Sequence, residues 1–231
     1  MSINIEQEYK QKVIAIWKKY DLIPILNEQE CEYRKSPLLP QSIETNSLLF
    51  VGCNPSLRID ATIINKEIEF YPIKIESEKT DIQYFEKIKD VASKSGMPSW
   101  SHLDMLFLRE TNQKIVEILT YSNVDFIQEQ LGIVFEIIER ASPRLIVVAN
   151  ALASEFFGKK KAKHNSFGAI WKGYNLDFGK DFDNEIGTYK INIGGKMTPV
   201  IFTGMLSGQR ALDLGSDERL IWQIKMILKK Y

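Results

Sequence analysis

The chain has 231 residues, of which 44% are hydrophobic and 26% are charged, values typical of a soluble globular protein with a sizeable core. Its 30 basic residues balance its 30 acidic residues, so any binding to nucleic acid has to use a local patch and not the charge of the whole domain. Two cysteines, Cys31 and Cys53, and two histidines are too few for a disulfide framework or a zinc site, and we expect neither a metal nor a cofactor.

The N-terminal sequence MSINIEQEYKQK has neither the basic start nor the apolar core of a signal peptide. The longest apolar run, residues 145–153, is interrupted by Asn150 and is too short to cross a bilayer. We therefore expect a cytoplasmic protein with no membrane partner.

In chain order, helical periodicity alternates with short apolar runs that are typical of buried strands. The expected elements are a helix at 4–20, a strand at 47–51, a helix at 81–95, a strand at 103–108, a helix at 125–141, a strand at 145–149, a helix at 151–157, a strand at 199–203 and a helix at 216–230. Strands that alternate with helices form βαβ crossovers. The pattern therefore predicts an α/β fold of three layers (αβα), in which helices cover both faces of a mostly parallel, four-stranded central sheet.

We expect a single domain over residues 1–231, since the chain contains no internal repeat and no low-complexity tract. Residues 1–35 are interpreted as an N-terminal helical extension of this domain. Residues 172–198 are interpreted as a hairpin excursion, because Gly194-Gly195 joins two extended segments. The sequence leaves the oligomeric state open.

The loop Gly52-Cys53-Asn54-Pro55-Ser56 directly follows the first expected strand. Ligands of parallel α/β sheets bind beyond the carboxyl ends of the strands, so this loop is a candidate part of a site. Gly52 allows a sharp turn and a close approach to a ligand, and Pro55 stiffens the loop around Asn54. The alternative is an ordinary strand-to-loop turn. Neither a P-loop nor a dinucleotide-binding fingerprint is present.

The motif VGCNPS resembles the first motif of the uracil-DNA glycosylase superfamily, in particular the G-x-N-P signature of its mismatch-specific and single-strand-selective branches. The other strands are similar in order. Residues 102–109 resemble the second strand, residues 145–150 the third, and residues 200–203, followed by GMLSGQR, the last strand and the loop that enters DNA.

This resemblance implies a uracil-DNA-glycosylase-like fold that extrudes a damaged or deaminated base from DNA and hydrolyses its N-glycosidic bond. Asn54 matches the position that orients the attacking water. The residues that the resemblance assigns to base binding are Gly52, Cys53, Pro55, Ser56, Asp104, Arg109 and Asn150.

Two positions depart from the family pattern. The last motif carries no histidine that could stabilise the leaving base, and Asp104 stands where an asparagine usually reads uracil. An ionised carboxylate accepts hydrogen bonds but donates none. We therefore expect Asp104 to suit a base that carries an amino or imino group better than it suits the carbonyl groups of uracil.

Nucleic-acid contacts are expected from two segments. They involve Lys160 and Lys161 in a basic cluster, and Leu206, Ser207, Gln209 and Arg210 after the last strand. Each has a plainer interpretation. The lysines can be a solvated cluster, Arg210 can pair with a nearby aspartate, and Leu206 can be a core residue and not a wedge between bases.

Two other classes of function remain open. The same fold can be a nucleic-acid or nucleotide binding module without catalysis, or Cys53 and His102 can form the nucleophilic pair of a small-molecule hydrolase. Against the hydrolase, no recognised nucleophile motif surrounds Cys53, and a small buried cysteine is the plainer interpretation.

Overall fold

The structure is a computed structural model that describes residues 1–29, 31–56, 67–72, 83–158, 174, 176, 180, 182–208 and 211–231. Four of the residues expected to contact nucleic acid, Lys160, Lys161, Gln209 and Arg210, lie outside these ranges.

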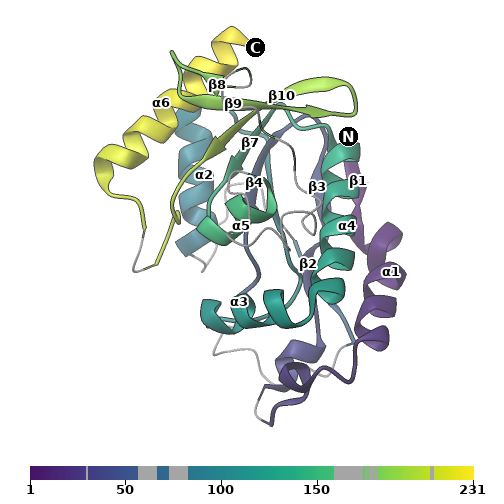
Figure 1. Ribbon diagram of the computed structural model, residues 1–231. Coiled ribbons are helices and arrows are strands. Elements are labelled where there is room, and N and C mark those ends of the chain that lie inside the picture. The colour runs from purple at the N-terminus through teal and green to yellow at the C-terminus, as the bar shows by residue number, and fades with distance from the viewer. Residues whose placement is uncertain are drawn as a thin grey trace.

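A six-stranded sheet forms the centre of the molecule (Figure 1). Its strands, in spatial order, are β6 (Trp100–Asp104), β4 (Leu48–Gly52), β7 (Leu145–Val148), β10 (Lys196–Phe202), β9 (Thr188–Ile193) and β8 (Phe182–Asp183). The first four strands run parallel to one another. Strand β9 pairs antiparallel with β10, and β8 pairs antiparallel with β9. The α/β class and the four parallel strands are confirmed, but the expected total of four strands is wrong.

The two extra strands come from the segment interpreted as a hairpin excursion. Gly194 and Gly195 connect β9 to β10 and have φ angles of 56° and 88°, which suit the tight turns of hairpins. Because β10 itself begins at Lys196, the hairpin continues into the last parallel strand. The expected excursion is therefore an extension of the central sheet.

Helices cover both faces of the sheet. The helices α2 (Gln83–Ser95) and α6 (Leu214–Lys230) pack on the face that receives Leu48 and Phe50. On the other face, Leu49 and Val51 contact the layer formed by α1 (Ile5–Lys19), α3 (Gln113–Ser122), α4 (Val124–Ala141) and α5 (Ala151–Phe156). Figure 1 shows α2 beside α6 at one side and α4 beside α1 at the other. Successive residues of a strand alternate between faces, so burial on both sides explains the continuous apolar runs.

The N-terminal residues belong to the domain. Strand β1 (Ser2–Asn4) pairs with β3 (Ser42–Glu44), and β2 (Leu38–Pro40) pairs with β5 (Glu69–Tyr71). Two short 3-10 helices, Pro24–Asn27 and Glu32–Lys35, connect α1 to β2. The α1 residues Tyr9, Val13 and Trp17 are buried in the core, so residues 1–35 are an integral part of the fold and not an appended helix.

Strand β6 ends earlier than the sequence indicates. The apolar run that predicted a strand at 103–108 is fully buried at Met105–Leu108, but these residues leave the sheet. They run beside the loop after β4, where Met105 N donates to Gly52 O at 3.1 Å and Leu106 N donates to Cys53 O at 2.9 Å. Asp104 is therefore the last residue of its strand, at the carboxyl edge of the sheet.

Helix α3 was not predicted, because no element was expected between the strand at 103–108 and the helix at 125–141. Asn112 caps it by accepting a hydrogen bond from Lys114 N at 3.1 Å. None of the helices in the described part of the chain is both long and apolar enough to span a membrane.

Candidate functional site

The side chain of Asn54 fixes the loop after β4. Its Nδ2 lies within hydrogen-bond distance of three backbone carbonyls, those of Pro55 at 3.0 Å, Leu108 at 3.2 Å and Glu110 at 2.7 Å. Its Oδ1 has no partner among the residues that the structure describes, and Asn54 is only half-buried. The amide nitrogen thus holds the loop in place, and Oδ1 is the atom left to bind a water molecule or a ligand.

Gly52 makes room for Asp104. The two residues are partners in the register of β4 and β6, and a Cβ atom added at Gly52 would lie 2.1 Å from Asp104 Oδ1. Any other residue at this position would displace the carboxyl group. Gly52 was expected to allow a ligand to approach the backbone closely. In this structure the group that approaches it is the side chain of Asp104.

The carboxyl group of Asp104 is buried without a hydrogen bond. The residue is 8% exposed and its carboxyl has no hydrogen-bond partner in the described ranges. Burial raises the pKa of Asp104 to about 8, because an apolar environment disfavours the charged form. At neutral pH the group is mainly a neutral acid, which both donates and accepts hydrogen bonds. In this form Asp104 can donate to a carbonyl group of uracil, which an ionised carboxylate cannot do.

His102 lies beside Asp104 on β6 and faces the α2 side of the sheet. Its Nδ1 is 2.9 Å from Tyr71 Oη and its Nε2 is 3.2 Å from Tyr84 Oη. The distance from Nε2 to Asp104 Oδ1 is 3.7 Å, too long for a hydrogen bond. Burial lowers the pKa of His102 to about 3, so the ring is neutral at physiological pH. One tyrosine then donates to the ring and the other accepts from it.

Cys53 does not have the environment of a nucleophile. It is buried in the core on the α4 side, and both its burial and the nearby charge of Asp104 raise the pKa of its thiol well above the usual range. A reactive cysteine requires the opposite shift, toward the thiolate. The structure therefore gives no support to a cysteine hydrolase built on Cys53 and His102.

Arg109 and Asn150 have structural partners. Arg109 is 5% exposed and forms an ion pair of 2.6 Å with Glu69 of β5. Asn150 caps α5, where its Oδ1 accepts from Leu152 N at 2.8 Å and from Ala153 N at 3.3 Å. No hydrogen bond or ion pair joins either residue to Asp104.

The segments expected to hold nucleic acid are only partly described. Leu206 is 2% exposed and belongs to the core between the sheet and α6, so in this conformation it packs and does not project. Ser207 is half-buried. In the loop after β4, Pro55 is buried and Ser56 is exposed. The structure thus places Asp104 against Gly52, two residues before Asn54 in the same loop, whereas Leu206 packs in the core.

Sequence reasoning missed Tyr71 and Tyr84. Tyr84 is one of two adjacent aromatic residues, with Phe85, at the start of an amphipathic helix, and Tyr71 belongs to a three-residue strand. Neither carries a local signal, because their contact with His102 arises only when β5 and α2 pack together over β6.

No protein-family model matches this sequence, and no curated protein matches it.

Proposed function

We propose that the protein is a DNA-glycosylase-like hydrolase that cleaves the N-glycosidic bond of a damaged or deaminated base. The observation that carries this proposal is the buried carboxyl group of Asp104, which has no hydrogen-bond partner in the part of the chain that the structure describes. It lies beside a loop in which the Asn54 amide is anchored through its nitrogen. Both groups lie at the carboxyl edge of a parallel sheet, where ligands of such sheets bind. The uracil-DNA-glycosylase-like fold is part of the proposal and rests on the VGCNPS motif.

In this mechanism Asn54 Oδ1 accepts a hydrogen bond from the attacking water. The water oxygen bonds to the anomeric carbon, the carbon–nitrogen bond breaks, and its electron pair leaves with the base, which ends with one proton of the water. An amide is too weak a base to remove that proton in advance, so Asn54 contributes orientation. Its three backbone contacts hold Oδ1 in a fixed direction before the substrate binds.

Asp104 in its neutral form supports the departing base. An acid proton donated to a base carbonyl stabilises the negative charge that develops there, in a site from which water is largely excluded. The second carboxyl oxygen accepts from a ring or exocyclic N–H group. The substrate class is therefore a base with an acceptor and a donor side by side, as deaminated purines and pyrimidines have.

The test measures base release from single- and double-stranded oligonucleotides that contain uracil, hypoxanthine or xanthine, with enzyme in excess. We expect wild type to release at least one base and Asn54→Ala to release about 100-fold less, since losing the orientation of a reacting group can cost on the order of 100-fold. Binding to an abasic-site oligonucleotide and thermal unfolding serve as controls. Equal release by wild type and a folded Asn54→Ala variant would contradict the role of Asn54.

A binding module without catalysis is the second candidate. It is favoured by the hydrogen bonds from Asn54 Nδ2 to backbone carbonyls. An asparagine with a purely structural role would make the same hydrogen bonds. This candidate predicts that oligonucleotides bind with no base released at any enzyme concentration.

A further inference from the structure

A concave site lies at the same edge of the sheet as Asp104, beyond the end of β10. It is a cavity of 660 Å³ between α6, the β8–β9 turn and the end of β10, within the size range of small-ligand sites. It shares no lining residue with the site around Asp104. Three strand spacings, roughly 14 Å in total at about 4.8 Å each, separate β10 from β6 in the sheet.

The walls of this cavity are held by contacts between α6 and the β8–β9 turn. Gln223 Nε2 donates to Ile186 O at 2.9 Å and to Gly187 O at 3.2 Å. At the last residue of α6, Lys230 forms ion pairs with Asp183 at 2.8 Å and with Glu185 at 3.0 Å. These contacts form the site in advance, so a ligand would not have to order it.

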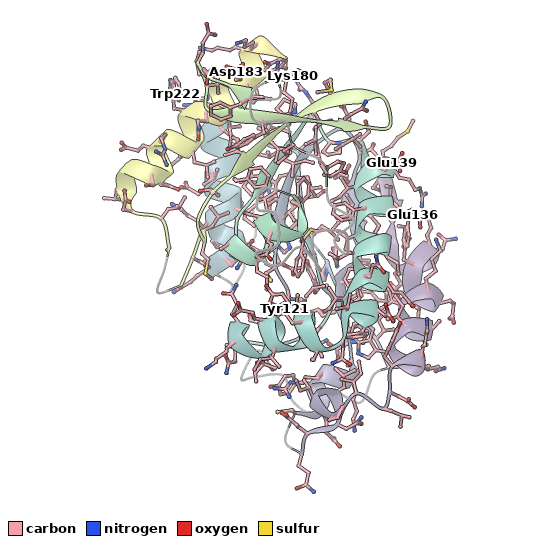
Figure 2. The ribbon with its side chains drawn as sticks, viewed as in Figure 1. Tyr121, Glu136, Glu139, Lys180, Asp183 and Trp222 are labelled. Atoms are coloured by element: carbon pink, nitrogen blue, oxygen red, sulfur yellow. The ribbon has the colours of Figure 1, made fainter. Side chains whose placement is uncertain are left out.

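Aromatic side chains line one part of the cavity. Phe182 of β8, Tyr189 of β9 and Phe202 of β10 form a contiguous series, with ring centroids 4.9 Å and 5.3 Å apart. Trp222 on α6 also lines the cavity and is 47% exposed, an unusual exposure for the largest apolar side chain. Figure 2 shows Trp222 at the same end of the molecule as Asp183 of β8. These rings offer a planar ligand a surface to stack on.

The lining also carries one cation without a partner among the described residues. Arg219 lies one helical turn before Trp222, is exposed, and makes no hydrogen bond or ion pair within the described ranges. The acidic residue of the lining, Glu185, is already paired with Lys230. A guanidinium group beside aromatic rings matches a ligand that joins an anionic group to a planar ring.

From this arrangement we propose that the cavity binds a small aromatic anion of nucleotide size, with its ring against Trp222 and its phosphate on Arg219. This site is separate from the proposed glycosylase site and does not depend on any base release. Ser154, Thr203 and Ser216 supply further polar groups around the ligand.

The test is titration calorimetry of the full chain with three probes: AMP, adenosine and ribose 5-phosphate. Wild type is expected to bind AMP in a saturable manner and about tenfold or more tightly than either fragment, because each fragment lacks one of the two contacts. The indole N–H resonance of Trp222, recorded in a ¹⁵N-labelled sample, is expected to shift with AMP.

Two variants locate the binding. Arg219→Gln is expected to weaken AMP binding about tenfold and to leave adenosine binding unchanged, whereas Trp222→Ala is expected to weaken both. Lys225→Gln is the matched control, since Lys225 is exposed on the same helix but does not line the cavity. All three side chains are on the surface, so the variants should fold.

Three results would overturn the proposal. They are no saturable AMP binding at millimolar concentration, equal binding of ribose 5-phosphate and AMP, or equal loss of affinity in Arg219→Gln and in the Lys225→Gln control.

Discussion

At the scale of single residues, the candidate site depends on how closely Gly52 and Asp104 approach. The carboxyl group occupies the space that a side chain at position 52 would need, and it is buried with no hydrogen-bond partner among the described residues. Its neutral form follows from that burial. The glycine thus leaves room for the carboxyl group at the place where burial keeps it neutral.

Gly52→Ala is expected to destabilise the protein by about 1–3 kcal/mol, because the new Cβ would lie 2.1 Å from Asp104 Oδ1 and force the carboxyl group to move. Denaturant unfolding measures this cost. In an Asp104→Ala background the same substitution should cost clearly less, since the nearest clash is absent. An equal cost in both backgrounds would show that the strain lies elsewhere.

The stability of the protein should report the raised pKa of Asp104. Its pKa is about 8 in the folded state and near 3.9 in the unfolded state, so the unfolded chain releases the proton first as the pH rises. The contribution is therefore fully present below about pH 4 and is lost as the pH rises toward 8. The free energy of unfolding of wild type, relative to Asp104→Asn, is expected to fall over this window by up to about 1.4 kcal/mol per pH unit. A difference that does not change with pH would contradict the raised pKa.

At this scale the sequence pointed to the loop around Asn54 and to Asp104, but not to the physical state of these groups. The motif around Asn54 and the position of Asp104 after a strand could be read directly. The attachment of Asn54 Nδ2 to the carbonyls of Leu108 and Glu110 could not, because it depends on a segment more than 50 residues away. The same holds for the neutral Asp104, whose burial results from packing of several elements.

At the scale of elements, hydrophobic periodicity located the four parallel strands and most of the helices. It placed the second strand at 103–108, and not at 100–104, because an apolar run continues after the chain has left the sheet. Periodicity also did not predict that β9 joins the central sheet. The Gly-Gly turn identifies a hairpin in the sequence, but nothing in the sequence shows where that hairpin packs. Burial alone therefore did not distinguish a strand from a buried loop.

The turn between β9 and β10 should tolerate only residues that accept a positive φ. At Gly195, where φ is 88°, Gly195→Val is expected to cost about 1–2 kcal/mol or more, and Gly195→Asn less, because asparagine enters the left-handed region more readily. No atom lies within 4 Å of a Cβ built there, so the comparison reports backbone strain and not a clash. Equal losses in denaturant unfolding would contradict this explanation.

At the scale of the whole molecule, a chain of contacts joins the N-terminal region to the candidate site. Arg34, which is 4% exposed, donates through Nε to Glu110 Oε2 at 2.8 Å, and it also contacts Glu28. The backbone carbonyl of Glu110 in turn accepts from Asn54 Nδ2 at 2.7 Å. The region interpreted as an extension thereby supports the loop that would hold the water.

Arg34→Met is expected to destabilise the protein by about 3–5 kcal/mol, because it leaves Glu110 buried without its cation. The double variant Arg34→Met/Glu110→Gln should recover part of this loss, since no unpaired charge remains. Denaturant unfolding of the wild type, both single variants and the double variant gives the coupling free energy between the two positions. Losses that simply add would contradict a buried pair.

The most direct test of the proposed function is single-turnover base release by wild type, Asn54→Ala and Asp104→Asn, measured at pH 6.5 and pH 9. We expect wild type to release a deaminated base at pH 6.5 and to slow at pH 9, where Asp104 with its pKa of about 8 has lost its proton. Asp104→Asn, which keeps a donor and an acceptor, should be active at a similar rate at both values, and Asn54→Ala should be about 100-fold slower than wild type. Release that does not need Asn54, or no release from any substrate by wild type, would contradict the proposal.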